Sequence, residues 1–197
     1  MASFTLEEIE KATGASLLQK GEDAFVEGVS TDTRTISRGE LFIALIGENF
    51  NGHEFLKRAV LSGASAVMIS DASYGKDIDA HVSVFLVKDT KKGLEDLAHF
   101  HRMRFQVPVI GVTGSNGKTT TKDMITSILR TRFHVTATEK NFNNEIGLSM
   151  TLLSMIAATE VCVVEMGMRG FGQIAELCLI ASPTMGVVTN VGTSHIG

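Results

Sequence analysis

Apolar and polar residues alternate along the chain with two periods, and segments of the two kinds follow one another. The first segment has helical spacing, with Leu6 and Ile9 on one face. Thr5 precedes it and Glu8 lies three residues further on, so the pattern predicts a helix that begins with a capping box. Gly14 predicts the end of this helix. Short runs rich in β-branched residues separate it from later helical segments, which favours helices layered on a sheet.

The same alternation predicts the remaining elements. We expect strands over residues 24–29, 41–45, 66–69, 83–87, 108–112, 134–137, 161–165 and 185–189, and helices over residues 53–62, 90–105, 118–130, 145–155 and 172–179. The second of these helices has two candidate caps, Asp89 and Thr90. We therefore expect an α/β fold, with a small N-terminal α/β domain over residues 1–106 and an incomplete, doubly wound mononucleotide-binding domain over residues 107–197.

Composition and charge exclude several classes of protein. Hydrophobic residues make up 44% and charged residues 20% of the chain, which is a globular composition rather than a disordered one. The net charge of −4 gives no overall positive field for nucleic acid or anionic lipid, so a phosphate ligand has to be bound locally. The apolar runs are too short for a membrane helix and the acidic N-terminus lacks a secretory pattern, so we expect a cytoplasmic protein. Cys162 and Cys178 lie in apolar segments and are interpreted as small buried side chains rather than as a disulfide or catalytic thiols.

One motif points to a specific chemistry. The segment GVTGSNGKTTTKDM follows a predicted strand and opens a predicted helix. Gly114 and Gly117 allow the backbone to turn its N–H groups toward phosphate oxygens at the helix start. Lys118 would reach the β- and γ-phosphates of ATP, and the Thr119 hydroxyl would bind the Mg²⁺ that bridges them. Val112 stands where the strict P-loop pattern has its first glycine, and the alternative is an ordinary glycine-rich turn. The position between a strand and a helix favours an ATP-binding loop.

Further polar residues lie next to predicted strand ends and helix starts. Glu165 ends the run VCVVE, at the sheet edge where open α/β sheets bind ligands. It is a candidate Mg²⁺ ligand, and the alternative is a solvated charge at a strand end. His195 follows the last predicted strand and is either a ligand of this site or a hydrogen-bonded structural histidine. Asn141, Asn143 and Asn144 precede a predicted helix, where asparagine caps the helix or binds a substrate.

Four segments of the chain resemble the central domain of the Mur ligases in order and spacing. They are TGSNGKTTT, NFNNEIG, VVEMGMRGFGQIAEL and TNVGTSHIG. Mur ligases are ATP-dependent enzymes that form amide bonds in peptidoglycan precursor synthesis. A further segment, VSTDTRTISRGELFIALIGENFNGHEF, resembles the small domain by which later Mur ligases hold the UDP end of their substrate. The resemblance covers nearly the whole chain and implies that the N-terminal domain binds a UDP-linked substrate.

The resemblance implies a role for each matching residue. The ATP loop would comprise Gly114, Ser115, Asn116, Gly117, Lys118, Thr119 and Thr120. The Mg²⁺ environment would comprise Thr119, Glu165 and His195, and the catalytic groups would be Lys118, Asn143, Asn144 and His195. Arg169 would lie near the reacting carboxylate, and the contacts to the UDP-linked substrate would be Ser30, Thr31, Asp32, Thr33, Arg34, Glu48, Asn49 and Phe50. A structural alternative is an Asx turn for Asp32 and a surface ion pair for Arg34.

Within the family, NFNNEIG and VEMGMRG are most similar to the member that joins D-alanyl-D-alanine to UDP-MurNAc-tripeptide. In the implied reaction, ATP phosphorylates the terminal carboxylate of the tripeptide, and the dipeptide amine then attacks the acyl phosphate. We expect a monomer that uses ATP and Mg²⁺, with no nucleic-acid partner and no membrane insertion. The alternatives are another Mur ligase, a folylpolyglutamate- or cyanophycin-type ligase, and a noncatalytic nucleotide-binding module; residues 31–55 argue against the second. The family's carbamylated lysine and its C-terminal domain would follow residue 197, so we expect the present residues alone to lack activity.

Overall fold

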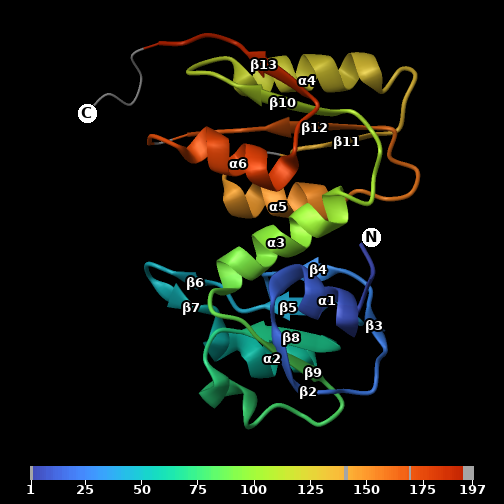
Figure 1. Cartoon of the computed structure of the whole chain (residues 1–197), viewed down its shortest axis with the longest axis vertical. Helices are drawn as coiled ribbons and strands as arrows, with labels where there is room; N and C mark the ends of the chain where they lie inside the picture. The colour runs from blue at the N-terminus through green and yellow to red at the C-terminus, as the bar shows by residue number, and fades with distance from the viewer. Residues whose placement is uncertain (1, 140–141, 169, 193–197) are drawn as a thin grey trace. The chain divides into compact units, whose positions relative to one another are not determined.

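The computed structural model describes residues 2–139, 142–168 and 170–192. Contacts divide the chain into two compact units, residues 1–97 and 98–197. This division lies within helix α3 (Thr90–Arg102), and each unit has its own sheet (Figure 1). The domain boundary that the sequence predicts, at residue 106, lies shortly after this helix and stays a prediction.

The first unit is built on a five-stranded sheet with the strand order β2-β9-β8-β5-β4. Its strands are β2 (Ser16–Gln19), β4 (Val29–Ser30), β5 (Leu41–Ile43), β8 (Ala66–Ile69) and β9 (Ser83–Leu86). Neighbours are parallel except for β2 with β9. Two antiparallel pairs lie outside this sheet, namely β1 (Phe4–Thr5) with β3 (Phe25–Val26) and β6 (Ile46–Gly47) with β7 (Phe50–Asn51). The helices are α1 (Leu6–Thr13), α2 (Leu56–Leu61) and the 3-10 helices η1 (Gly52–Phe55) and η2 (Ala72–Gly75).

The predicted ends of α1 and the predicted start of α3 are confirmed, whereas α3 ends at Arg102, before the predicted residue 105. Thr5 Oγ1 accepts from the Glu8 N–H, and the Glu8 carboxylate accepts from the Thr5 N–H, which completes the capping box of α1. Gly14 ends α1 in the left-handed conformation, with φ +65°. Of the two candidate caps for α3, Asp89 accepts N–H bonds from the first turn, whereas the Thr90 hydroxyl donates to a backbone carbonyl of the first unit.

The single strand predicted over residues 24–29 is wrong. Two strands, β3 and β4, form there and belong to different sheets. Gly28 separates them with φ +137°, and the Glu40 side chain lies 2.9 Å from the place of a Cβ at this position. The helix predicted over 53–62 also differs, because η1 precedes α2. Strands β1, β2, β6 and β7 were not predicted. Three of them are only two residues long, which is too short to show a period.

One face of the first sheet is covered by α2. Leu56 and Ala59 of this helix belong to the same buried cluster as Phe42, Val67 and Val84 of three neighbouring strands. Burial of these side chains is the main source of stability for the unit, and it fixes the loops that precede and follow the strands.

The second unit carries a four-stranded parallel sheet with the order β11-β12-β10-β13. Its strands are β10 (Val109–Thr113), β11 (Val135–Ala137), β12 (Val161–Glu165) and β13 (Met185–Val188), and its helices are α4 (Lys118–Leu129), α5 (Glu145–Leu153) and α6 (Gln173–Ala181). Figure 1 shows α4 on one side of the sheet and α5 and α6 on the other. The doubly wound arrangement predicted from the sequence is therefore confirmed.

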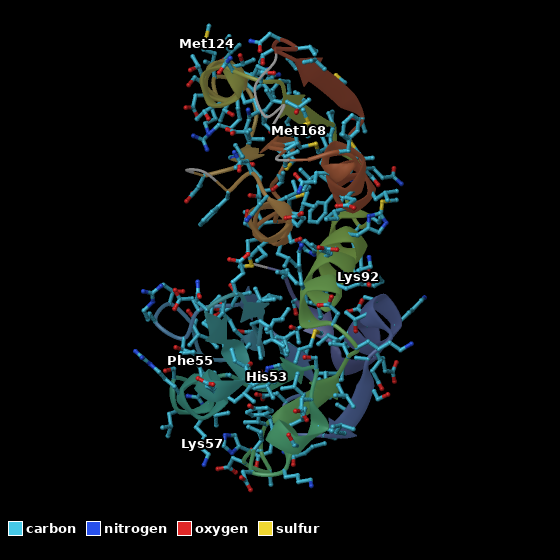
Figure 2. All side chains as sticks on the ribbon, turned by 90° about the vertical axis from the view of Figure 1, so that its left-hand side faces the viewer. His53, Phe55, Lys57, Lys92, Met124 and Met168 are labelled. Atoms are coloured by element: carbon cyan, nitrogen blue, oxygen red, sulfur yellow. The ribbon has the colours of Figure 1, made fainter. Side chains whose placement is uncertain are left out.

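Helix α4 has a sheet-facing stripe and an exposed stripe. Ile125 and Leu129 pack against valines of the sheet. Met124 and Ile128 are exposed, and Figure 2 shows Met124 on the outer side of the helix. Lys122, three residues before Ile125, is buried on the sheet side with 4% of its surface exposed.

Two further expectations concern membranes and cysteines. No helix among the described residues is long and apolar enough to span a membrane. Cys162 and Cys178 are free, as predicted, but Cys178 is only partly buried, which differs from the prediction. Cys162 is buried, and burial raises the pKa of its thiol to about 12, so this group remains protonated and unreactive near neutral pH.

Candidate functional site

The glycine loop joins β10 to α4 in the second unit. Gly114 has φ +134° and Gly117 has φ +78°, so both adopt conformations that favour glycine. A Cβ atom on Gly114 would collide with Thr189 Oγ1. Among the described residues no side chain caps α4, so the N–H groups at its start are open to an anion.

The segment after β13 holds the loop from the other side. The Asn190 carbonyl accepts from the Ser115 N–H, and Asn190 Oδ1 accepts from the Asn116 N–H, both at 3.0 Å. Thr189 Oγ1 and Asn190 Nδ2 donate to the Asn116 carbonyl at 2.6 and 3.1 Å. The Gly192 N–H donates to Ser115 Oγ at 2.8 Å. Sequence reasoning gave this segment no separate role, although a polar run directly after a strand at the same sheet edge is a usable signal.

The Lys118 ammonium lies over the glycine loop. Its Nζ donates to the carbonyl oxygens of Gly114 at 2.7 Å and Ser115 at 3.2 Å. The positive charge is thus held beside the N-terminal N–H groups of α4, which carry partial positive charge themselves. This combination favours a polyphosphate at the loop.

Thr119 and Thr120 follow on the first turn of α4, and both are exposed. Thr120 lines a surface cavity of about 420 Å³ together with Met124 and Ile128 on the outer face of the helix. The role of Thr120 in the ATP loop stays a prediction.

Glu165 ends β12, next to the strand that carries the loop. The register pairs Glu165 with Val112 of β10, so the carboxylate and the loop lie at the carboxyl ends of adjacent parallel strands. Glu165 is 1% exposed, which rules out the solvated charge of the alternative interpretation. Its Oε1 accepts from Asn143 Nδ2 at 2.9 Å, and the Asn143 carbonyl accepts from the Gly167 N–H at 2.8 Å. Glu165 Oε2 has no hydrogen-bond partner among the described residues.

A divalent cation fits this carboxylate. A buried carboxylate oxygen without a partner is unfavourable, and Mg²⁺ takes oxygen ligands. Thr119, on the first turn of α4, carries a hydroxyl oxygen of the kind that this ion binds, and its role as a ligand stays a prediction. The described residues contain no cluster of three or more His, Cys, Asp or Glu side chains that could hold a metal ion. His195, the third predicted member of this site, lies outside the described residues.

The asparagines of NFNNEIG divide their roles. Asn144 Oδ1 accepts from the Gly147 N–H at 2.9 Å and caps α5, whereas Asn143 holds Glu165. Asn141 and Arg169 lie outside the described residues.

A cavity of about 460 Å³ lies in the first unit beside the end of β4. Its lining residues are Thr31, Asp32, Thr33, Arg34, Phe42, Phe50, Gly52, Phe55 and Arg58. Five of the eight predicted substrate contacts are among them. Of the other three, Ser30 is buried and its hydroxyl bonds the backbone of Asp32, while Glu48 and Asn49 lie exposed between β6 and β7.

Asp32 and Arg34 form the structural contacts that the alternative interpretation names. Asp32 Oδ1 accepts from the Arg34 N–H at 2.9 Å, as in an Asx turn, and the two side chains form an ion pair at 2.6 Å. Hydrogen bonds from the Arg34 guanidinium and then from its backbone N–H lower the pKa of Asp32 to about 2. The pair forms part of the cavity wall, so these contacts also shape the cavity.

Sequence reasoning missed four lining residues, Phe42, Gly52, Phe55 and Arg58. Arg58 lies on α2, and its guanidinium has no hydrogen-bond or ion-pair partner among the described residues. Because Arg34 is neutralised by Asp32, Arg58 supplies the net positive charge of the cavity. Figure 2 shows Phe55 near the surface of this unit. The apolar spacing of α2 predicts only the buried face of this helix, so it gave no signal for Arg58.

Next to the cavity, His53 joins η1 to the end of β8. Its Nδ1 bonds Asn51 Oδ1 at 2.7 Å, and its Nε2 accepts from the Ser70 N–H at 2.9 Å, so the ring is neutral with the proton on Nδ1. Burial lowers the pKa of His53 from its ordinary value. The neutral ring therefore holds the segment that contains Gly52 and Phe55 of the cavity.

The sheet and the glycine loop of the second unit define the class of P-loop nucleotide-binding domains. Residues 25–102 match the family described as "Mur ligase family, catalytic domain", and residues 112–197 match the "Mur ligase middle domain". The two matches together take in most of the chain, and the chain belongs to the Mur ligase family.

Relatives and solved structures agree with this assignment. The chain is 46% identical over 182 residues to the UDP-N-acetylmuramoyl-tripeptide–D-alanyl-D-alanine ligase of Synechocystis and 46% identical over 175 residues to that of Bacillus subtilis, covering 92% and 89% of this chain. The match takes in 40% and 38% of those two proteins. The crystal structure of MurF from Acinetobacter baumannii is similar with a TM-score of 0.89 at 31% identity, over 100% of this chain and 42% of that one. MurF from Thermotoga maritima in complex with ADP is similar with a TM-score of 0.77 at 34% identity, over 87% of this chain and 39% of that one.

Proposed function

We propose that the chain forms the substrate- and ATP-binding part of a cytoplasmic ligase that joins D-alanyl-D-alanine to UDP-MurNAc-tripeptide in peptidoglycan precursor synthesis. The observation that carries the proposal is the pairing of the Lys118 loop with the buried, half-partnered Glu165 on the adjacent strand. The relatives named above support the choice of substrates, because their names state this tripeptide and this dipeptide.

The second unit binds and orients ATP. The α4 N-terminus and Lys118 hold the β- and γ-phosphates and neutralise the charge that develops on the transferred phosphoryl group. The tripeptide carboxylate attacks the γ-phosphorus, which gives an acyl phosphate and ADP. The amine of D-alanyl-D-alanine then attacks the acyl carbon and expels inorganic phosphate. Positioning of the reactants, to which Asn143 contributes through Glu165, supplies much of the catalysis.

Glu165 and Thr119 hold Mg²⁺ in this proposal. When bound, the ion screens the charges of the phosphates that the loop gathers. Asn143 keeps Glu165 Oε1 fixed by its hydrogen bond, so that Oε2 is the oxygen left for the ion.

The cavity of the first unit binds the uridine-diphosphate end of the substrate. Its volume of about 460 Å³ suits part of a nucleotide, and the exposed Phe50 and Phe55 offer apolar surface for a base. Arg58, which forms no ion pair with any described residue, offers a cation for the diphosphate.

The proposal is tested by titration calorimetry of the chain with UDP-MurNAc-tripeptide and, separately, with the non-hydrolysable ATP analogue AMP-PNP and Mg²⁺. We expect saturable binding of both ligands, and we expect Lys118→Ala to weaken AMP-PNP binding by about a hundredfold while leaving the UDP compound unaffected. A matched control is Lys57→Met, which removes an exposed lysine far from the loop in sequence. A folded chain that binds neither ligand contradicts the proposal.

Ligation itself is tested in a chimera. The corresponding residues of the Bacillus subtilis ligase are replaced by this chain, and phosphate release that depends on D-alanyl-D-alanine is measured. We expect activity that requires Lys118 and Glu165. A folded chimera that binds both ligands but whose phosphate release does not increase when D-alanyl-D-alanine is added contradicts a ligase of this specificity.

A further inference from the structure

Lys122 is a buried charged residue for which the proposed reaction provides no role. Only 4% of its surface is exposed, and it lies on the stripe of α4 that faces the sheet, one turn after Lys118. A buried ammonium group is unfavourable unless it is paired, so its contacts call for an explanation. The ammonium has two contacts, the Thr138 carbonyl at 2.9 Å and the exposed Asp123 carboxylate at 2.7 Å.

The contact with Thr138 replaces a bond of the sheet. Thr138 follows β11, and its N–H donates to the Val163 carbonyl of β12 at 3.0 Å, as the parallel ladder requires. The next ladder bond would run from the Glu165 N–H to the Thr138 carbonyl. Instead the Glu165 N–H donates to Thr138 Oγ1 at 3.0 Å, and the Thr138 carbonyl accepts a hydrogen bond from the Lys122 ammonium.

This exchange lies directly behind the candidate metal ligand. The hydroxyl of Thr138 fixes the backbone of Glu165 on one side, while Asn143 fixes its Oε1 on the other. Thr138 is 2% exposed, so water does not substitute readily for these bonds. Lys122 thereby connects the helix that carries the phosphate-binding lysine to the residue that carries the carboxylate.

We propose that Lys122 and Thr138 form a brace that positions Glu165 for the divalent cation of the nucleotide site. Lys118 acts on the phosphates directly, whereas Lys122 acts through Thr138 and is a positioning residue. The proposal rests on the proposed function of the loop as a Mg²⁺–ATP site. It explains why a lysine stands at a sheet-facing position of α4, where Ile125 and Leu129 are the other occupants.

The test compares AMP-PNP affinity of the chain in Mg²⁺ and in EDTA by calorimetry. The dissociation constant in EDTA divided by that in Mg²⁺ measures the contribution of the metal. The dissociation constant in EDTA alone measures binding to the phosphate loop. We expect Lys122→Met and Thr138→Val to lower this ratio by about tenfold, the range found for groups that orient metal ligands, and to leave the EDTA value within about twofold. Thr138→Ser, which keeps the hydroxyl, and Lys57→Met, at an exposed position, should preserve the ratio.

A second readout does not depend on nucleotide. Amide hydrogen exchange at Glu165, measured by NMR relative to Val163, should accelerate in Lys122→Met and in Thr138→Val but not in Thr138→Ser. If Lys122→Met fails to fold, the Thr138 pair decides the outcome through both readouts.

The two proposals fail in different ways. A chain that does not bind AMP-PNP contradicts the proposed function, and the exchange at Glu165 then decides whether the brace positions this residue. A folded Lys122→Met variant whose Mg²⁺ ratio equals that of the unchanged chain, or a Thr138→Val variant that behaves as Thr138→Ser, overturns the brace.

Discussion

The glycine loop of the second unit and the cavity of the first unit are built from different parts of the chain. In the loop, backbone groups and glycine conformations set the geometry, and the segment after β13 holds it through bonds to Ser115 and Asn116. In the cavity, side chains from the ends of β4, from β5 and β7, and from η1 and α2 form the lining, and charge is set by Arg58 after Asp32 neutralises Arg34.

The difference predicts how each site responds to change. A backbone-built loop tolerates few alterations, because a single Cβ in the wrong place displaces every N–H group at once. A cavity lined by side chains loses affinity in steps, one contact at a time. Substitutions that add a methyl group test the loop, and substitutions that remove a charge test the cavity.

The largest effect is expected for Gly114→Ala. The added Cβ would collide with Thr189 Oγ1 and approach the Asn190 backbone within 3.0 Å, at a φ of +134° that alanine rarely adopts. We expect the affinity for AMP-PNP and Mg²⁺ to fall by about a hundredfold or more, as measured by calorimetry.

Gly117→Ala is the matched control for this substitution. It has φ +78° but no atom within 4 Å of the added Cβ, so the cost is that of a left-handed alanine, about 1–2 kcal/mol. Equal losses of affinity in the two variants would show that backbone conformation alone, rather than the contact with Thr189 and Asn190, sets the loop.

The loop was the easier site to predict because its signal is local. Two glycines, a lysine and a threonine stand within six residues between a strand and a helix, and their spacing alone limits the backbone. The position of Glu165 beside the loop could also be predicted, since residues at the carboxyl ends of parallel strands share one edge of the sheet. The role of Lys122 was not predicted: its spacing from Ile125 and Leu129 places it on the sheet-facing stripe of α4, but its partner Thr138 is distant in the sequence.

The cavity was predicted only in part, because some of its lining residues are consecutive in the sequence and others are distant. Thr31, Asp32, Thr33 and Arg34 are consecutive, so the matching segment covers them. Arg58 and Phe42 reach the cavity only through the packing of α2 on the sheet, which pairs residues far apart in sequence. The strand break at Gly28 was not predicted either, because the Glu40 side chain that lies against this glycine is twelve residues away in the sequence.

A smaller effect is expected for Arg58→Met in the first unit. This change removes the cation of the cavity but keeps an apolar stem. We expect UDP to bind about tenfold more weakly, whereas uridine, which lacks the diphosphate, should bind unchanged. Lys57→Met on the same helix is the control, and calorimetry with both ligands is the measurement. Equal weakening for UDP and uridine would contradict the assignment of Arg58 to the diphosphate.

His53 should make the stability of the first unit depend on pH. The folded unit requires the neutral ring, and the pKa of His53 is lowered by burial, so its contribution is complete above pH 6.5 and is lost as the pH falls through the lowered folded-state value. Protonation removes the acceptor for the Ser70 N–H, which costs about 1 kcal/mol. Urea unfolding between pH 8 and pH 5 measures this. In His53→Gln, which does not titrate, the dependence should be flatter, and an unchanged slope would contradict the role of His53.

The smallest effect is expected for Asp32. Its pKa is lowered from 3.8 to about 2 by Arg34, so its contribution is complete above pH 4 and is lost as the pH falls toward 2. Because the pair is largely exposed, the contribution should stay below about 1 kcal/mol. Asp32→Asn should reduce the acid sensitivity of unfolding in this window only. A loss of several kcal/mol in the variant at pH 7 would contradict this account, because asparagine keeps the Oδ1 acceptor of the Asx turn and removes only the charge of the ion pair.

The most direct test of the account is a crossed titration, in which the unchanged chain, Lys118→Ala and Arg58→Met are each titrated with AMP-PNP plus Mg²⁺ and with UDP. The account predicts that Lys118→Ala weakens only the AMP-PNP complex and that Arg58→Met weakens only the UDP complex. A folded Lys118→Ala variant that binds AMP-PNP as tightly as the unchanged chain would contradict the assignment of the glycine loop to ATP.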